Sequence, residues 1–352
     1  MAHVTLYGLA HPHANAHLKT LGLSDQVDKL TVFDPDTELV SKASTEHPKV
    51  TDGYSDLDEA IVRGPDVGVT CFRNDLNADL CVRLLNAGIH VISEKPVGAT
   101  AAAVRRAVDA ASAKRLRLGV MYQNRFHPLS QEARRVVLSG EIGRVTGCEA
   151  RLITSQVQFR DPDHWLFKKE VAGGGILSWL GCHYLDLLRY VTGEEITDVS
   201  AMVATLSGEA IDVEDVATLS LRFSSGFLGS LHAGYQLALS KSGYMGPNYE
   251  TYISIRGTEG RVVWEPSGSE SKLLVESTWQ SAAPSREVSF SLSSVDAYGG
   301  AYGLAFVDQF IVSTQSNEVE PAATGLDALR IAEVIEGAYS SSETGQQVSL
   351  VS

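Results

Sequence analysis

The chain has 352 residues, with 29 Lys and Arg against 43 Asp and Glu, so its formal net charge is −14. It contains no apolar run of the roughly 18 residues that a membrane-spanning helix needs. Its excess of acid disfavours a nucleic-acid partner, because phosphate binding requires clustered Lys and Arg. We therefore expect neither membrane nor nucleic-acid partners, in a chain long enough for two domains.

The N-terminal stretch MAHVTLYGLA enters a strand pattern directly, without a basic region or a cleavage site. We therefore expect no signal peptide. The four cysteines, Cys71, Cys81, Cys148 and Cys182, are scattered and form no C-x-x-C pair. They indicate buried thiols in a protein of the reducing cytoplasm.

The first third of the chain alternates strand and helix patterns. Short Val-, Ile- and Leu-rich runs predict strands at 4–9, 29–36, 66–72, 89–96 and 115–121. Helical spacing lies between them, at 13–23, 37–47, 76–88 and 99–114, and Gly88 ends the third helix. Such alternation is typical of a doubly wound parallel sheet, in which ligands bind beyond the carboxyl ends of the strands.

The pattern changes after residue 122. Longer alternating stretches at 145–157, 198–206, 216–223, 227–236, 249–257 and 272–278 predict one large, mostly antiparallel sheet. Helical periodicity returns at 301–315 and 325–342. The predicted domains are 1–122, of Rossmann type, and 123–352, an α/β domain with a large open sheet.

The loop after the first strand reads GLAHPHA and departs from the G-x-G-x-x-G dinucleotide-binding fingerprint. Gly8 keeps the first glycine, whereas Ala10 and His13 replace the second and third. Pro12 suits a helix start, whose free N–H groups attract phosphate. Asp34 ends the second strand, where a carboxylate can bind a ribose 2′-hydroxyl and repel a 2′-phosphate. We therefore predict NAD, with NADP as the alternative; an ordinary turn acid is the competing interpretation of Asp34.

The same loop carries three histidines, His11, His13 and His17. Residues 13 and 17 lie one helical turn apart, which is a metal-ligand spacing. No carboxylate or cysteine completes a ligand set nearby in the sequence. We therefore expect no metal, and histidines that lie beside phosphate or solvent.

The stretch HVISEKPVG places Glu94, Lys95 and Pro96 at the end of a predicted strand, with Lys95 at its exposed carboxyl edge. It closely resembles the EKP motif of the glucose–fructose oxidoreductase, inositol dehydrogenase and MocA family. The resemblance extends over nearly the whole chain. It includes QNRFHP and the following LSGEIGRV, DHWLFKKEVAGGG, GGGILSWLGCHYLDLLRYVTG and ISIRGTEGRV.

This resemblance implies NAD or NADP, and the oxidation or reduction of a hydroxyl on a sugar or cyclitol. It implies a homodimer or homotetramer built on the open sheet, whose uncovered face we expect to be apolar. By position, Lys95 and His183 match the family's catalytic lysine and histidine. Asn77 replaces a common histidine, and Trp179 replaces the family's aspartate. The predicted cofactor-binding residues are Gly8, Ala10, His11, Pro12, His13, Asp34, Asn74, Glu94, Lys95 and Pro96.

A helical projection of 176–191 predicts which side of that helix faces the core. Ile176, Leu180, Leu187 and Val191 form one apolar stripe, with His183 on its edge. Trp179, Asp186 and Tyr190 flank His183, and Ser178, Cys182 and Arg189 lie opposite. Without the family, His183 reads as a core histidine held by Asp186. The preceding GGG would let the backbone turn and admit a sugar. The predicted substrate-binding residues are Tyr122, Asn124, Trp165, Lys168, Trp179 and His183.

We therefore expect a sugar, glycoside or cyclitol oxidoreductase. His183 would accept the hydroxyl proton, and Lys95 would steady the charge that develops on the oxygen. Trp179 would offer an apolar face to the substrate. Two alternatives stay open: a lyase or glycosidase that oxidises only transiently, and a ligand-sensing regulator without turnover.

Overall fold

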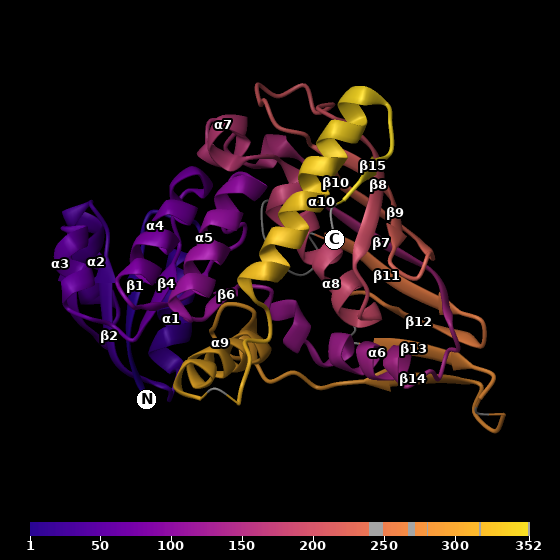
Figure 1. The fold of residues 1–352 in the computed structure, drawn as a ribbon, viewed down its shortest axis with the longest axis horizontal. Coiled ribbons are helices and arrows are strands. Elements are labelled where there is room, and N and C mark those ends of the chain that lie inside the picture. Colours follow the sequence, from indigo (N-terminus) through magenta and orange to yellow (C-terminus); the bar gives the residue numbers. More distant parts are fainter. Residues whose placement is uncertain (239–248, 267–271, 280, 317, 351–352) are drawn as a thin grey trace. The chain divides into compact units, whose positions relative to one another are not determined.

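The computed structural model describes residues 1–238, 249–266, 272–279, 281–316 and 318–350 (Figure 1). The chain packs into two compact units. The first contains residues 1–126 and 292–330, and the second contains residues 127–291 and 331–352. Residues 292–330 thus pack with the first unit, whereas the predicted boundary assigns everything after residue 122 to the second domain.

The first unit is built on a parallel sheet of six strands in the order β3-β2-β1-β4-β5-β6. Its strands are β1 (Ala2–Tyr7), β2 (Val27–Phe33), β3 (Val50–Tyr54), β4 (Val67–Thr70), β5 (His90–Ser93) and β6 (Leu118–Val120). Most of their residues are buried, as apolar runs require in a sheet covered on both faces. The strand order reverses between β1 and β4, the usual place for a ligand crevice. The prediction of a doubly wound sheet is confirmed.

The helices of this unit begin at side-chain caps in several cases. They are α1 (Ala14–Leu23), α2 (Thr37–Glu46), α3 (Leu57–Val62), α4 (Asn74–Asn86), α5 (Ala101–Lys114) and α9 (Gly300–Gln315). Asp36, Asp56 and Thr100 cap α2, α3 and α5 by accepting a backbone N–H. The returning helix α9 contacts α1. Strand β3 and helix α3 were not predicted, because VTDGY is a weak strand sequence that depends on pairing with β2.

The second unit contains a sheet of nine strands in the order β14-β13-β12-β11-β7-β10-β9-β8-β15. The strands are β7 (Val145–Ser155), β8 (Ile196–Ala204), β9 (Val216–Phe223), β10 (Leu228–Leu237), β11 (Tyr249–Gly257), β12 (Gly260–Trp264), β13 (Lys272–Ser277), β14 (Ser285–Ser289) and β15 (Val348–Ser349). Only β7 and β10 pair in parallel among these described strands. The predicted large, mostly antiparallel sheet is therefore confirmed.

The helices that follow or precede these strands are α6 (Pro128–Leu138), α7 (Lys169–Ala172), α8 (Cys182–Thr192) and α10 (Gly325–Thr344). The division between the two units falls inside α10. Among the residues that the structure describes, no helix is both long and apolar enough to cross a membrane.

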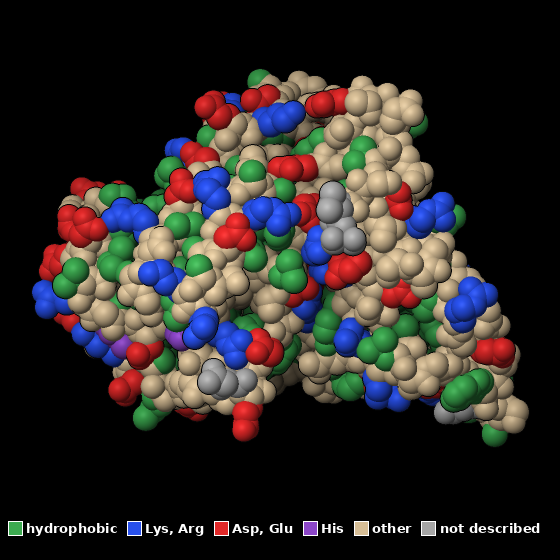
Figure 2. Space-filling model, viewed as in Figure 1, with side chains coloured by type: hydrophobic (Ala, Val, Ile, Leu, Met, Phe, Trp, Pro, Cys, Tyr) green, Lys and Arg blue, Asp and Glu red, His purple; other side chains and the backbone are tan. Residues whose placement is uncertain are grey.

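One face of the nine-stranded sheet carries mostly polar side chains. The strand register aligns one row across β8, β9, β10, β7 and β11: Met202, Thr218, His232, Arg151 and Tyr252. Arg151 pairs with Glu250 at 2.9 Å, and Arg256 pairs with Glu149 at 3.0 Å. The expectation of an apolar face is therefore wrong, because cross-strand ion pairs occupy it. Acidic and basic side chains are also interspersed over the surface that Figure 2 shows.

Candidate active site

The turn after β1 is joined to the end of β2. Gly8 has a φ of +100°, and a Cβ at this position would lie 2.3 Å from the Cys71 carbonyl oxygen, so only glycine fits. The Asp34 carboxylate accepts the N–H groups of Leu9 (2.7 Å) and Asp36 (2.9 Å) and is 4% exposed. Asp34 thus fixes the loop at the carboxyl edge of the sheet, while its two oxygens retain further acceptor capacity.

The loop histidines form a buried cluster around Glu94. His13 Nδ1 and His17 Nε2 each lie 2.9 Å from Glu94 Oε1. The hydroxyl of Tyr298, which lies in the 292–330 part of the first unit, is 3.0 Å from His13 Nδ1. Burial alone would raise the pKa of Glu94, but His13 and His17 hold that pKa well below its usual range. Burial also lowers the pKa of His13 and brings that of His11 well below its usual range.

This cluster explains why a histidine can replace the third glycine of the fingerprint. The glycine normally permits close packing of helix against strand. Here the His13 ring is itself packed, because it forms a hydrogen bond with Glu94 and lies against the Tyr298 ring, tilted by 37° with centroids 4.9 Å apart. Pro12 lies in the turn before α1, not in its first turn. Across the described ranges, no group of three His, Cys, Asp or Glu is arranged to hold a metal ion.

Lys95 is the second residue after β5 and is 1% exposed. The prediction of an exposed strand end is therefore wrong. Its backbone N–H donates to Glu94 Oε2 at 2.7 Å, and the bond to Pro96 is cis. The histidine cluster and the Lys95 backbone therefore share one carboxylate, which ties the turn to α1.

Two asparagines of α4 also support this edge. The Asn77 side-chain amide donates to Ser93 Oγ (2.8 Å) and to the Val97 carbonyl (3.0 Å), so it bridges both sides of the Glu94–Pro96 turn. Asn74, the first residue of α4, is 3% exposed, and its carbonyl accepts the Ala99 N–H. Asn77 therefore holds the lysine-bearing turn in place.

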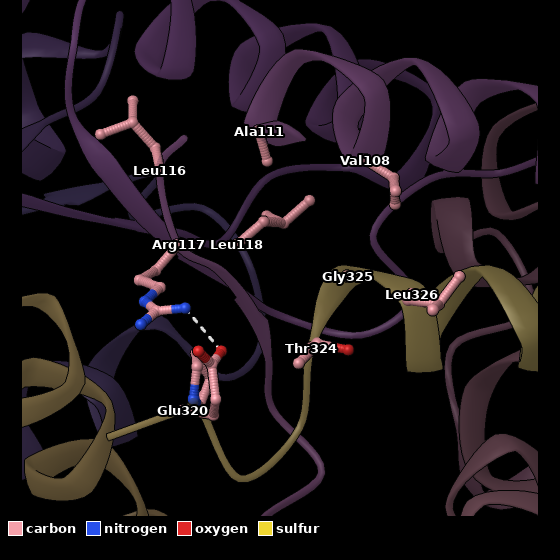
Figure 3. Close-up of a pocket in the computed structure, with 10 residues that line it drawn as sticks. Val108, Ala111, Leu116, Arg117, Leu118, Glu320, Thr324, Gly325 and Leu326 are labelled. Atoms are coloured by element: carbon pink, nitrogen blue, oxygen red, sulfur yellow. Dashed lines mark hydrogen bonds and ion pairs between the residues drawn. The ribbon is translucent and has the colours of Figure 1, made fainter. Parts of the chain in front are cut away.

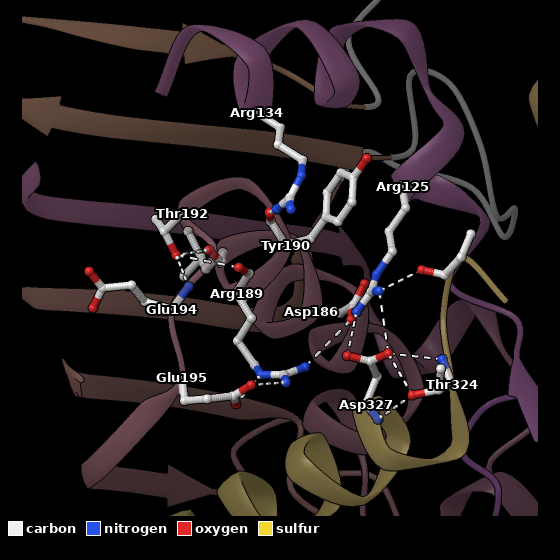
Figure 4. A network of polar contacts seen from close by, with 12 residues as sticks. Arg125, Arg134, Asp186, Arg189, Tyr190, Thr192, Glu194, Glu195, Thr324 and Asp327 are labelled. Carbon is white, nitrogen blue, oxygen red and sulfur yellow. Dashed lines mark hydrogen bonds and ion pairs between the residues drawn. The ribbon is translucent and has the colours of Figure 1, made fainter. Parts of the chain in front are cut away.

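A short helical turn, η1 (Gln123–Phe126), follows β6. Asn124 lies within this turn, and Tyr122 directly precedes it. Tyr122 is buried and Asn124 is partly exposed. The neighbouring Arg125 pairs with Asp327 at 3.0 Å and donates to the Ala322 carbonyl at 2.7 Å (Figure 4). This pairing anchors the segment to the returning part of the first unit.

A separate shallow cavity in the first unit lies between α5, β6 and the start of α10 (Figure 3). Arg117 and Glu320 form an ion pair at its rim, at 2.5 Å. None of the residues that line this cavity belongs to the predicted site.

The helix that carries His183 is buried on all sides. A π-helical turn, η4 (Leu177–Gly181), runs directly into α8. His183 is 6% exposed, and Cys182 and Arg189, predicted to lie opposite the core, are buried as well. Leu180, predicted to face the core, is only partly buried. The amphipathic projection is therefore wrong, because it assumed a regular α-helix with one solvent face.

Aromatic and charged groups surround this helix within the second unit. The Trp179 ring meets Trp165 edge-on, with centroids 6.4 Å apart, and Trp179 is 3% exposed. Arg189 lies 4.0 Å from Asp186 and pairs with Glu195 at 2.6 Å (Figure 4). Lys168 is partly exposed and lies 3.9 Å from Asp163. Trp165 and Trp179 thus form one aromatic corner.

Two of the three glycines lie against other residues of the protein. A Cβ on Gly174 would lie 1.9 Å from the Tyr339 hydroxyl, and a Cβ on Gly175 would lie 1.9 Å from the Glu214 carbonyl oxygen. Gly173 ends α7 with a φ of +78°. The interpretation that GGG clears space for a sugar is therefore corrected: Gly174 and Gly175 make room for Tyr339 and Glu214.

The predicted residues divide between the two units. The predicted cofactor-binding residues, with Tyr122 and Asn124, belong to the first, and Trp165, Lys168, Trp179 and His183 belong to the second. Tyr298, Glu214 and Tyr339 were missed. Each lies far in the sequence from the residues that it contacts, and no local motif marks any of the three. The sequence offers one weak signal, the pair of acids Glu214 and Asp215 directly before the predicted strand at 216–223.

The loop chemistry fits a dinucleotide. Ala10 and Pro12 are exposed, so the backbone between β1 and α1 is accessible to a pyrophosphate at a helix start. The Asp34 carboxylate stands at the end of β2, where a ribose hydroxyl is bound in such folds. Gly8, Ala10 and Asp34 are the residues that would hold the nucleotide.

Two protein-family models match the chain. The model described as "Oxidoreductase family, NAD-binding Rossmann fold" covers residues 7–122. The model described as "GFO/IDH/MocA C-terminal domain" covers residues 130–263.

Relatives and solved structures agree with these matches. Levoglucosan dehydrogenase of Pseudarthrobacter phenanthrenivorans is 28% identical over 230 residues, spanning 58% of this chain and 57% of that protein. Inositol 2-dehydrogenase of Rhizobium meliloti is 27% identical over 286 residues, 81% of each chain. A levoglucosan dehydrogenase structure in complex with NADH and levoglucosan has a TM-score of 0.85 at 22% identity, covering 99% of both chains, and shows the shared fold.

Proposed function

The chain belongs to the GFO/IDH/MocA family of oxidoreductases, with an NAD-binding Rossmann domain, and we propose that it oxidises a hydroxyl of a sugar, glycoside or cyclitol with NAD. The burial of Lys95 at the carboxyl edge of the first sheet is the observation that carries this proposal. Lysine side chains are almost always exposed in folded proteins, and this one lies at the sheet edge where parallel sheets bind their ligands. Here its turn is also held by Glu94 and Asn77.

The proposed roles follow from where the hydride, the proton and the developing negative charge must go in the reaction. When bound, the nicotinamide ring supplies a hydride acceptor. His183 takes the proton of the reacting hydroxyl, because a neutral imidazole is a suitable base near pH 7. Lys95 donates a hydrogen bond to the same oxygen and stabilises its developing negative charge.

Other residues support binding in this proposal. The His13–Glu94 hydrogen bond would hold the loop. The cofactor would contact residues at the carboxyl edge of the first sheet: Gly8, Ala10, His11, Pro12, Asp34, Asn74 and Pro96. The substrate would contact Tyr122, Asn124, Trp165, Lys168 and Trp179. A carbohydrate-like polyol suits this set, because aromatic rings pack on C–H faces while amide and ammonium groups bind hydroxyls.

The experiment that tests the proposal is a spectrophotometric screen for reduced nicotinamide. Purified protein is incubated with NAD⁺ or NADP⁺ and a panel of sugars, cyclitols and glycosides. We expect net NAD⁺ reduction with at least one polyol. Bond cleavage or elimination without net reduction would instead identify a transiently oxidising enzyme. NADH binding with no turnover on any member of the panel would favour a sensor.

We further propose a homodimer or homotetramer that uses the outer face of the nine-stranded sheet, in the cytoplasm. The paired charges on this face suit a polar interface, and Leu228 on its strand β10 is 56% exposed. All four cysteines are buried thiols, which suits a reducing compartment. Light scattering should give a multiple of the 37.8 kDa chain mass; a monomer at micromolar concentration would contradict the assembly.

A further inference from the structure

The start of the helix that bears His183 is held by one side chain, Glu214. Its carboxylate accepts the Gly175 N–H at Oε2 (2.8 Å) and the Leu177 N–H at Oε1 (2.9 Å). Its backbone carbonyl accepts the intervening N–H, from Ile176, at 3.0 Å. Three successive amides are therefore bonded to a single residue from the segment before β9.

Tyr339, on α10, completes this arrangement. Its hydroxyl donates to Glu214 Oε1 at 3.0 Å and lies 3.5 Å from Ser178 Oγ. Glu214 is 7% exposed, and burial raises its pKa. Burial raises the pKa of Tyr339 well above its usual range, so the phenol keeps its proton and stays a donor. We call Glu214 and Tyr339 the helix-start clamp.

The glycines show how closely the clamp and the helix start fit. Gly174 and Gly175 are the residues whose missing Cβ atoms leave room for the Tyr339 hydroxyl and the Glu214 backbone. A helix start exposes amide N–H groups that need acceptors, and a carboxylate placed there forms strong charge-assisted bonds. A plain cap would need one acceptor and no such close approach.

The clamp acts on the segment that carries the functional side chains. The Trp179 N–H donates to the Gly175 carbonyl at 2.9 Å, so the π-helical turn starts from a clamped residue. His183 follows in the first turn of α8. The helical backbone runs without a break from the clamped residues through η4 into α8, so a displaced helix start would displace the side chains that follow it, His183 included.

We propose that Glu214 and Tyr339 are positioning residues that fix the start and rotation of the helix bearing His183, and thereby place its imidazole for catalysis. The inference rests on the proposed function of His183. Neither clamp residue touches the reacting groups in this role. A misplacement of about 1 Å at a catalytic group can lower turnover about 100-fold, which sets the scale of the expected effect.

The first test needs no substrate. Glu214→Gln keeps the shape but turns one acceptor into a donor that faces an amide N–H, and Tyr339→Phe removes only the hydroxyl. Glu170→Gln, an exposed acid on neighbouring α7, is the matched control for loss of charge. Hydrogen–deuterium exchange should become faster in peptides covering 174–183 in both clamp variants, more so in Glu214→Gln, and stay as in wild type in Glu170→Gln. Unchanged exchange in both clamp variants would overturn the proposal.

The second test uses any polyol that the wild type oxidises. We expect kcat to fall about tenfold or more in Glu214→Gln, and less in Tyr339→Phe, with NADH affinity within about twofold of wild type. The apparent pKa of the kcat profile should also move, since His183 changes place. A lower Tm with unchanged kcat and pH profile would mean that the clamp is only structural. If the wild type oxidises no polyol, the proposed function fails, while the exchange data still decide whether the clamp fixes the helix start.

Discussion

Replacing Trp179 by alanine separates a packing role from a substrate-binding role. Trp179 is 3% exposed and meets Trp165 edge-on. An indole buries about 200 Å², which at about 25 cal/mol per Å² corresponds to about 5 kcal/mol. This area term is an upper bound, because unfolded chains already bury part of their surface. We therefore expect the free energy of unfolding to fall by about 3–5 kcal/mol, the usual range for Trp→Ala in a core.

The assay is urea denaturation followed by far-UV circular dichroism. The single variants Trp179→Ala and Trp165→Ala are compared with the double variant, and we expect a coupling of about 0.5–1.5 kcal/mol from the edge-on ring pair. Trp279→Ala is the control, because Trp279 is 65% exposed and its loss should cost about 0.5 kcal/mol or less.

The two roles leave different signatures. A contact with the substrate, which the proposed function assigns to Trp179, would show in addition as a loss of sugar affinity of about 1–3 kcal/mol with nearly unchanged NAD affinity. If Trp179→Ala lowers the free energy of unfolding by less than about 1 kcal/mol, the burial argument is refuted. Trp179→Asp, which restores the family's usual residue, should not raise turnover, because a carboxylate would replace a packed ring.

Three further outcomes are expected. Lys95→Met should lower turnover about 10³-fold while fluorescence titration shows unchanged NADH binding, since the ammonium serves the reacting oxygen; wild-type rates would remove the lysine from the mechanism. NADH should bind more tightly than NADPH, because the Asp34 carboxylate repels a 2′-phosphate, and Asp34→Ala should narrow that difference; tighter NADPH binding by the wild type would contradict this. Burial lowers the pKa of His127 to about 4, so between the unfolded value of 6.5 and about 4 the unfolded state binds more protons. The free energy of unfolding should therefore decrease as the pH is lowered through that window, by up to about 3 kcal/mol, and the urea midpoint of His127→Asn should decrease less over the same range. Equal pH slopes for the wild type and the variant would exclude His127 as the source.

The fold could be predicted because its signals are local. Continuous apolar runs and helix stops mark most of the first sheet, and alternating runs mark the second. The motif around Lys95 could also be located from the sequence. In contrast, the burial of Lys95 and the bonds of Glu94 to His13 and His17 depend on residues far apart in the chain. No period or spacing predicts such contacts.

The π-helical turn and the clamp escaped prediction for a related reason. A projection at one fixed angle assumes regular geometry, and η4 breaks that regularity between Trp179 and His183. The glycines before it suggested an open space, because a missing side chain looks the same in a sequence whether a ligand or a neighbouring residue takes its place. Here the Tyr339 hydroxyl takes that place, although Tyr339 lies 161 residues beyond Ser178 in the chain.

The discontinuous course of the first unit limits how this protein can be cut into pieces. A fragment that ends at residue 126 would contain all six parallel strands but lack Tyr298, whose phenol packs on His13, and Asp327, the carboxylate partner of Arg125. It would therefore expose a guanidinium and an imidazole cluster that the intact chain buries. A nucleotide-binding fragment made by recombinant expression, or a chimera that exchanges the second unit, should instead carry residues 292–330 as well as residues 1–126.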